Sequence, residues 1–398
     1  MAKGIIGWAQ QFLFHQAELR RFQKLKSEQR DIVFYSESGA YWSYLGPFIE
    51  HLTRDHGRDV CYVTSSDDDQ IFKSPPSGVK AFSIGEGTAR TVFFAALDAN
   101  LLVTSLLDLE TFHVKRSMKA AVHYVFVPHN MVSTHMVFRK GAFDSFDTVF
   151  CVGPHQVAEL REAEQLYNSP AKVLVENGYV RLDTIHKEAP NIISSGITGH
   201  LKIVIAPSWG PNRLLETGAE LLIENLLNAE HDVTVRPHWE TLRRAGPALD
   251  NLDAQFGYSD KFRLLREKSS NKILYEADLL VSDWSGAAFS YAFGLERPVM
   301  FIDVPKKINN PDYSDFKNIP IEITLREELG AVLSPDDYGN AALVAQRLCN
   351  EVEVYAKKIS ALRSKVVFNF GNSAETGARY LAELADKNRH SKSEKSNS

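Results

Sequence analysis

The stretch from 277 to 303, ADLLVSDWSGAAFSYAFGLERPVMFID, contains a strand, a polar turn, a helix and a second strand in one run. The apolar residues 279–281 and 299–302 have the composition of strands that are buried on both faces. Residues 287–294 between them suit a helix, and the proline after Arg297 ends it. Two buried strands joined through a helix form a parallel pair, so this stretch predicts a parallel α/β sheet.

Ligands of such sheets bind where the strands end and the helices begin. Ser285 and Gly286 lie at that junction, where free main-chain N–H groups and the positive helix end favour a phosphate. Asp283 and Ser285 are also residue types that ordinarily cap helices. From this stretch alone, a phosphate site and a plain helix cap are equally supported.

The same alternation extends along both halves of the chain. Further strand-like runs lie at 32–35, 60–64, 101–104, 122–127, 148–152, 172–175, 203–205, 233–235 and 272–274. We therefore predict an α/β protein with two doubly wound, Rossmann-like domains, over 31–190 and 200–370, joined by a polar linker. Two such domains facing across a cleft resemble the GT-B arrangement of many nucleotide-sugar transferases.

The two ends of the chain differ from this pattern. Residues 1–30 predict an amphipathic N-terminal helix with an aromatic, apolar start and a basic end, which can lie in a membrane interface. The alternative is that this helix packs on its own domain or on a partner subunit. Residues 371–386 suit a C-terminal helix that crosses back to the N-terminal domain, and the polar tail 387–398 is expected to be disordered.

Composition excludes several classes of protein. A net charge of −5 argues against a nucleic-acid binder that works by bulk charge. Three widely spaced cysteines without a CxxC pair predict a reducing, cytoplasmic location, and no apolar run approaches the roughly 20 residues of a membrane span. The sequence has no P-loop, GxGxxG or GxSxG motif and no metal-ligand spacing, so a hydrolase, a dehydrogenase and a metal site lack support.

Four polar clusters follow strand-like runs, and the first is centred on His129, between Pro128 and Asn130. The pKa of a histidine suits a general base near neutral pH. A histidine at a strand end is equally a common structural hydrogen-bonding residue. Residues farther along this segment that can bind an anionic group are Ser133, Thr134, Arg139 and Lys140.

The other clusters combine small, cationic and hydroxyl residues. Ser208 lies in an APSWG segment, where small residues let a ligand approach the main chain and the hydroxyl can donate to phosphate. Arg236 and His238 flank a proline, and the planar guanidinium of arginine donates two hydrogen bonds to a phosphate at once. Asp283 and Ser285 complete the series. Each cluster alone also fits a turn, a salt-bridged arginine or a helix cap.

Taken in order, these clusters resemble the motif series of the CDP-glycerol glycerophosphotransferase family, which builds teichoic-acid-like polymers. Three departures are visible: Asn130 replaces the usual glycine, Gly210 stands where an arginine is common, and Trp239 replaces the second proline of R-P-H-P. They leave ribitol phosphate or a glycosyl donor open. The matching segments are PHN at 128–130, NGYVRLD at 177–183, IAPSWG at 205–210, VRPHW at 235–239 and VSDWSGAAFSYAFGLERPVMFID at 281–303.

The resemblance implies transfer of glycerol phosphate from CDP-glycerol, or a related CDP-polyol, to a lipid-linked or polysaccharide acceptor, with CMP leaving. The acceptor would bind the N-terminal domain and the donor nucleotide the C-terminal one. His129 would take the proton of the acceptor hydroxyl. Residues that would hold the donor phosphates are Ser208, Arg236, His238, Ser285 and Gly286.

The resemblance also implies a role for Asp283, a location of the enzyme in the cell, and a mechanism that needs no metal ion. Asp283 would orient His238, itself a second catalytic residue, or hold a ribose hydroxyl. The enzyme would act in teichoic acid or capsule synthesis, peripherally on the inner face of the cell membrane. Fixed donors make a metal or other cofactor unnecessary, and Mg²⁺ stays an open alternative. Two other hypotheses are a GT-B glycosyltransferase with a nucleotide-sugar donor and a non-catalytic nucleotide-binding scaffold.

Overall fold

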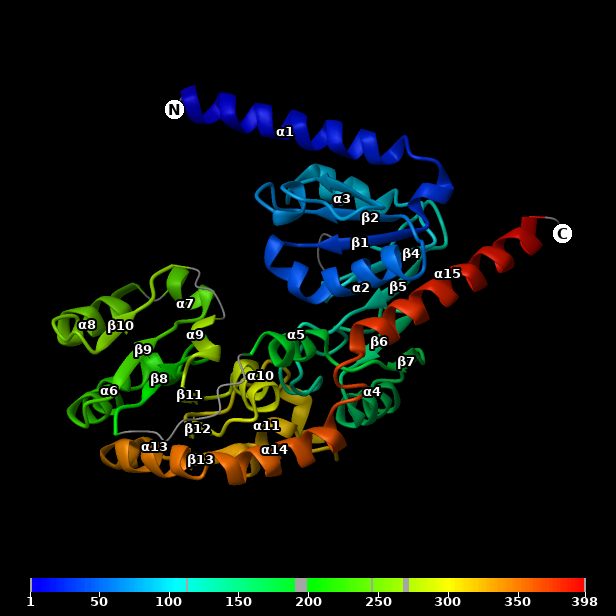
Figure 1. Cartoon of the computed structure of the whole chain (residues 1–398). Helices are drawn as coiled ribbons and strands as arrows, with labels where there is room; N and C mark the ends of the chain where they lie inside the picture. The colour runs from blue at the N-terminus through cyan, green and yellow to red at the C-terminus, as the bar shows by residue number, and fades with distance from the viewer. Residues whose placement is uncertain (1, 112–113, 190–198, 245, 268–271, 397–398) are drawn as a thin grey trace. The chain divides into compact units, whose positions relative to one another are not determined.

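Parallel strands form two separate sheets in the computed structural model, which describes residues 2–111, 114–189, 199–244, 246–267 and 272–396. Contacts divide the chain into two compact units. Unit 1 comprises residues 1–129, 138–181 and 367–398, and unit 2 comprises residues 130–137 and 182–366. The two-domain α/β class predicted from the sequence is confirmed (Figure 1).

Unit 1 contains a seven-stranded, all-parallel sheet within the described residues, in the order β3-β2-β1-β4-β5-β6-β7. Its strands are β1 (Ile32–Ser36), β2 (Val60–Thr64), β3 (Val79–Ser83), β4 (Leu101–Thr104), β5 (His123–Phe126), β6 (Thr148–Cys151) and β7 (Val173–Glu176). Its helices are α1 (Ala2–Gln23), α2 (Trp42–Arg54), α3 (Thr88–Ala95), α4 (Pro154–Leu166) and α15 (Ser373–Ser396), and α5 (Val180–Glu188) runs from unit 1 into unit 2.

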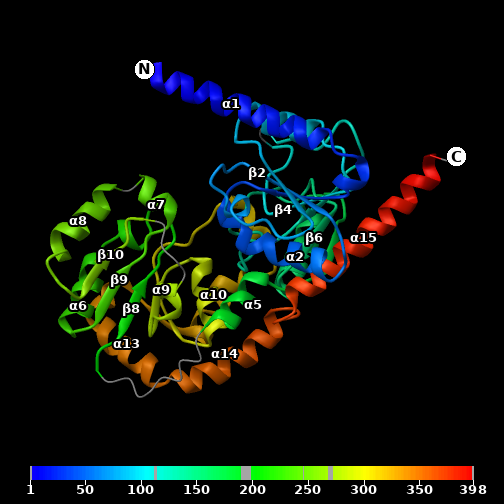
Figure 2. The same cartoon turned by 45° about the horizontal axis from the view of Figure 1, so that its top comes forward.

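Alternation along β1 explains why helices cover both faces of this sheet. Val33 and Tyr35 point into a core with α1 and α3, whereas Phe34 points into a second core with α2 and α15. Because successive side chains of a strand face opposite sides, an unbroken apolar strand requires cover on both. Figures 1 and 2 show α2 and α15 side by side in unit 1.

Unit 2 contains a six-stranded parallel sheet in the part of the chain that the structure describes, in the order β10-β9-β8-β11-β12-β13. Its strands are β8 (Lys202–Ile205), β9 (Asp232–Val235), β10 (Phe262–Leu264), β11 (Leu279–Ser282), β12 (Val299–Ile302) and β13 (Gly330–Leu333). Its helices are α6 (Ala219–Asn228), α7 (Trp239–Arg244), α8 (Gly246–Phe256), α9 (Lys272–Tyr275), α10 (Gly286–Leu295), α11 (Ile321–Thr324), α12 (Arg326–Leu329), α13 (Ala341–Asn350) and α14 (Val352–Val366).

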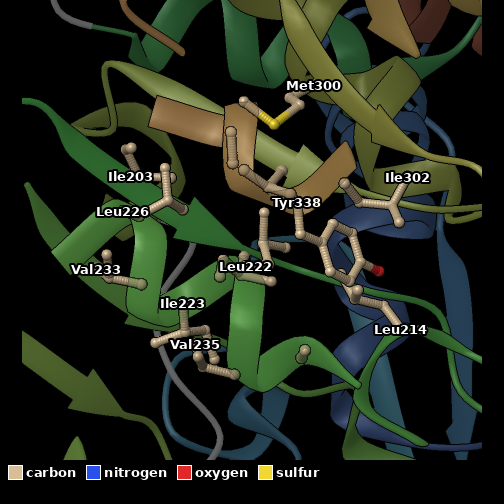
Figure 3. Close-up of a cluster of buried hydrophobic side chains, with 14 of the residues drawn as sticks. Ile203, Leu214, Leu222, Ile223, Leu226, Val233, Val235, Met300, Ile302 and Tyr338 are labelled. Atoms are coloured by element: carbon tan, nitrogen blue, oxygen red, sulfur yellow. The ribbon is translucent and has the colours of Figure 1, made fainter. Parts of the chain in front are cut away.

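The core of unit 2 lies between this sheet and the helices α6 and α13. Ile203 and Val233 from neighbouring strands pack against Leu222 and Leu226 of α6. Figure 3 shows these side chains together with Met300 of β12 and the ring of Tyr338. This core supports the strand ends at which the polar clusters begin.

Residues 130–137 fall within the predicted N-terminal domain by sequence, yet they pack into unit 2. The side chain of Met136 is fully buried in the core of unit 2. The side chain of Asn310 donates to the carbonyl of His135 (2.9 Å), and the ring of His135 stacks on Phe316 at 4.4 Å. Residues 130–137 therefore belong to unit 2, and the chain returns to unit 1 at residue 138.

Both predicted terminal segments are helical. In α1, the ring of Phe22 is buried and His15 pairs with Asp67 at 2.8 Å, so this end of the helix packs on its own unit. Trp8 and Leu13, nearer the start of α1, are 68% and 66% exposed. The tail from 387, which we expected to be disordered, instead continues α15 to Ser396, because extending a helix that residues 373–386 already form needs no new nucleus. Residues 397–398 lie outside the described residues.

The run 272–274, which we expected to be a strand, begins the short helix α9. Three apolar or amphipathic residues are too few to show a period, so the sequence could not separate a strand from a helical turn here.

Candidate active site

Three of the four polar clusters lie at one edge of the sheet of unit 2. Strand β8 runs into Ser208, β9 into Arg236 and His238, and β11 into Asp283 and Ser285. These strands are parallel neighbours in the order β9-β8-β11, so their carboxyl ends share an edge. The structure thus brings together the residues that the sequence suggested for phosphate binding.

Asp283 holds the loop after β8 in place. Its side chain is 2% exposed, and its carboxylate accepts the N–H of Ser208 at 2.7 Å and that of Leu214 at 3.4 Å. These bonds fix a loop that contains Trp209 and Gly210. The contacts of Asp283 thus give it a task that the sequence did not suggest, as an acceptor for main-chain groups.

Ser285 and Gly286 start helix α10. The Ser285 hydroxyl accepts the N–H of Ala287 at 3.3 Å, so this residue does cap the helix. A methyl group placed on Gly286 would meet Val132 at 3.5 Å and Asn130 at 3.7 Å. The segment that follows His129 in the sequence therefore lies beside the first turn of α10 within unit 2.

The Ser208 hydroxyl is buried, and its hydrogen-bonding capacity is unused among the described residues. Ser208 is 4% exposed, and its Oγ has no hydrogen-bond partner among the described residues. A buried hydroxyl without a partner costs free energy, so a ligand that accepts or donates a hydrogen bond there would relieve it.

Trp209 is surrounded by cationic and aromatic groups. Its ring stacks on that of His238, with centroids 6.1 Å apart and planes at 27°. The ammonium of Lys307 lies 4.9 Å from the centroid of Trp209, and the guanidinium of Arg244 lies 5.5 Å from it. Trp209 and Lys307 were not predicted as site residues. The only local signal was the pair of lysines shortly after β12.

The charged side chains around Trp209 and His238 are mostly cationic. Burial lowers the pKa of His238 to about 4, helped by Lys307 and Arg236 and opposed by Glu240. Burial also lowers the pKa of Lys307 to about 8, with Asp283 opposing and Arg213 assisting the shift. At neutral pH His238 is therefore neutral and Lys307 is mostly charged. The cations Arg236, Arg244 and Lys307 outnumber the carboxylates Asp283 and Glu240, which favours an anionic ligand.

His129, at the end of β5 in unit 1, sits among aromatic rings. The centroids of Tyr41 and Phe138 lie 5.8 and 5.9 Å from that of its ring. Burial lowers the pKa of His129 to about 4, against a hydrogen bond to the main chain of Ser105. Its Nδ1 has no hydrogen-bond partner among the described residues. Tyr179 donates to the carbonyl of His129 at 2.9 Å, which fixes the main chain. The ring is therefore neutral at pH 7 and can accept a proton at Nδ1.

The four residues predicted to bind the acceptor are divided between the two units. Ser133 and Thr134 belong to unit 2 and are buried, whereas Arg139 and Lys140 belong to unit 1. The N–H and hydroxyl of Ser133 both bind Glu322, at 3.0 and 3.2 Å, so Ser133 anchors its own segment and is not open to a ligand. The guanidinium of Arg139 lies 3.8 Å from Asp108, and the ammonium of Lys140 lies 4.1 Å from the centroid of Tyr167.

Neither a metal cluster nor a membrane span emerges from the described residues. Within them, no three histidine, cysteine, aspartate or glutamate side chains are grouped so that they could bind a metal ion. No helix in the described ranges combines the length and the apolar character that crossing a bilayer requires.

Comparison with solved structures shows which proteins share this fold. The wall teichoic acid polymerase TagF, in a structure of its H444N variant with CDPG, matches with a TM-score of 0.59 at 16% identity, over 94% of each chain. A putative UDP-N-acetylglucosamine 2-epimerase from Listeria monocytogenes matches with a TM-score of 0.56 at 12% identity, over 87% of this chain and 94% of that one. Anabaena Alr3699/HepE, in complex with UDP and glucose, matches with a TM-score of 0.52 at 13% identity, over 89% and 99%.

These neighbours place the chain among the two-domain α/β proteins of the GT-B class. Among curated proteins, none matches the sequence. The model of the CDP-glycerol:poly(glycerophosphate) glycerophosphotransferase family matches residues 20–320. The chain belongs to this family and is an enzyme of the glycerophosphotransferase type, with CDP-glycerol as donor.

Proposed function

We propose that this enzyme transfers glycerol phosphate from CDP-glycerol to a hydroxyl of a lipid-linked or polysaccharide acceptor during synthesis of a cell-surface polymer, teichoic acid or capsule. The observation that carries the proposal is the cationic cluster at the carboxyl edge of the unit 2 sheet, with the buried Ser208 hydroxyl beside it. The diphosphate of the donor carries negative charge that would balance the cations of this cluster.

The bond changes follow from this assignment. The acceptor oxygen attacks the phosphorus that bears glycerol, and the bond from this phosphorus to the oxygen shared with CMP breaks. The hydroxyl proton passes to His129, whose neutral ring can accept it. Arg236, neutral His238 and the main-chain N–H groups at Gly286 stabilise the charge on the phosphoryl oxygens and on the leaving CMP.

The test is release of CMP from CDP-glycerol in the presence of a lipid-linked or oligomeric acceptor, with CDP-ribitol and UDP-sugars in parallel. His129→Ala should lower turnover roughly 100- to 10,000-fold, and His238→Ala should also lower it. His200→Ala, which alters an exposed histidine of unit 2, should not. Turnover only with a UDP-sugar would overturn the donor assignment, and full activity of both variants would overturn the mechanism.

The pH profile gives a second readout of His129. A base must be deprotonated to act, and the pKa of His129 is lowered to about 4. The rate should therefore stay level as the pH falls through 6.5 and drop only near pH 4. A drop centred at pH 6.5 would assign the base to another group.

We further propose that the enzyme is cytoplasmic and binds the inner face of the cell membrane through the start of α1. Trp8, Phe12, Leu13 and Phe14 are exposed there, and the rings of Trp8 and Phe12 stack at 5.8 Å. Aromatic and aliphatic side chains of this kind insert at the headgroup level, and exposed cations such as Lys24 favour anionic lipid.

A further inference from the structure

The loop after β12 carries two consecutive lysines in different surroundings. The side chain of Lys306 is exposed to solvent. That of Lys307 is half-buried, with its ammonium 4.9 Å from the centroid of Trp209. Arg213 donates to the carbonyl of Pro305, which holds this loop close to the one that follows β8.

The ammonium of Lys307 lacks a full counter-charge. Within the described ranges it forms no hydrogen bond and no ion pair. Asp283 acts on it electrostatically, but the carboxylate oxygens of Asp283 already accept main-chain N–H groups. A half-buried cation without an ion pair is costly, and an anionic ligand would remove that cost.

The neighbouring loop offers the Ser208 hydroxyl, while its cation, Arg213, donates to the carbonyls of Pro305 and Lys306. Gly210 follows Trp209 with a φ of +119°, and a methyl group built on it would meet nothing within 4 Å. An arginine, which the family resemblance led us to expect here, is absent, so the space beside Trp209 is open and the cation comes from the loop after β12. The buried Ser208 hydroxyl without a partner precedes Trp209 in the chain.

We propose that Lys307 is a donor-binding residue: its ammonium, lying against Trp209, binds a phosphate oxygen of the donor nucleotide. This inference rests on the proposed function, because it takes the diphosphate of the donor as the ligand. A charge-assisted hydrogen bond of this kind holds the phosphate during transfer and stabilises the departing CMP.

Because the pKa of Lys307 is lowered to about 8, the proposal predicts that the affinity for CDP depends on pH. The charged groups that face Lys307 are Asp283 and Arg213, the neutral ring of His238 also faces it, and Arg244 lies over the ring of Trp209. The pKa of Lys307 is lowered to about 8, so its ammonium is mostly present at pH 7 and mostly lost at pH 9. The terminal phosphate of CDP has a pKa near 6, so it is about nine-tenths ionised at pH 7 and changes little up to pH 9.

The experiment is calorimetric titration of the full chain with CDP, and in parallel with UDP, at pH 7 and pH 9. The variants are Lys307→Gln, Lys307→Arg and, as a matched control, Lys306→Gln. We expect Lys307→Gln to weaken CDP binding roughly 10- to 100-fold at pH 7. Lys307→Arg should recover part of this loss, and Lys306→Gln should bind as the wild type does. Wild-type affinity should fall about tenfold from pH 7 to pH 9, and Lys307→Gln should not show this fall.

The outcomes separate the two proposals. Equal CDP binding by wild type and Lys307→Gln would overturn the role of Lys307 and leave the donor assignment standing. Binding of UDP but not of CDP, with Lys307→Gln weakened toward UDP, would support Lys307 and overturn CDP-glycerol as donor. Failure of the wild type to bind any nucleoside diphosphate would overturn both. If Lys307→Gln does not fold, the wild-type pH dependence decides, and a flat profile would overturn the proposal.

Discussion

Replacement of Asp283 by alanine should destabilise unit 2 even without a ligand. The carboxylate is 2% exposed and accepts two main-chain N–H groups that have no other acceptor among the described residues. In Asp283→Ala both groups stay buried without a partner. Each such loss costs about 1–3 kcal/mol, and the 3.4 Å bond to Leu214 belongs at the low end of that range. We therefore expect a loss of about 2–4 kcal/mol in the free energy of unfolding.

Urea unfolding followed by tryptophan fluorescence would measure this loss. Three of the five tryptophans, Trp209, Trp239 and Trp284, lie in unit 2 and report on it directly. Asp283→Asn should lose less, because an amide oxygen can still accept the N–H of Ser208. Asp315→Ala, at an exposed aspartate of unit 2, should change the stability by less than about 0.5 kcal/mol. If Asp283→Ala proved as mild as Asp315→Ala, the carboxylate would not be the anchor of this loop.

The remaining predictions concern unit 1. Gly178→Ala should cost more than about 3 kcal/mol, because a methyl group there would lie 2.2 Å from the carbonyl oxygen of Phe368 at a φ of +92°. Gly57→Ala, with a φ of +59° and open space, should cost only about 1–2 kcal/mol in the same thermal unfolding assay; equal losses would refute the clash. Trp8→Ser with Leu13→Ser should weaken sedimentation with anionic lipid vesicles about tenfold or more. Leu343→Ser, at another exposed leucine, should not, and unchanged sedimentation of the double variant would remove the membrane proposal.

Continuous apolar runs made much of the fold predictable. The runs 279–281 and 299–302 became β11 and β12, because central parallel strands are buried on both faces. The strand β3 was missed since three of its five residues are half-buried and its sequence includes a lysine. The strand β10 was missed because it has only three residues, one of them an exposed arginine.

The site residues that directly follow strands could be predicted from the sequence. Ser208, Arg236 and Asp283 follow neighbouring parallel strands, so the sheet brings them to one edge. Lys307 was not predictable, because its position depends on a loop that packs through Arg213. Ser133 looked like a ligand-binding residue, but Glu322, 189 residues later in the chain, uses both of its polar groups. A hydrogen-bond partner so distant in the sequence cannot be recognised from the residues around Ser133.

The route of the chain also bears on its synthesis. The polypeptide passes between the two units four times, after residues 129, 137, 181 and 366. Helix α15, which begins at Ser373, packs with α2 on the face of the first sheet to which Phe34 and Val103 point. In a nascent chain, part of this apolar face therefore stays uncovered until α15 has been translated. Premature termination anywhere before α15 would release a protein whose first unit is unfinished, and quality-control proteases should recognise it.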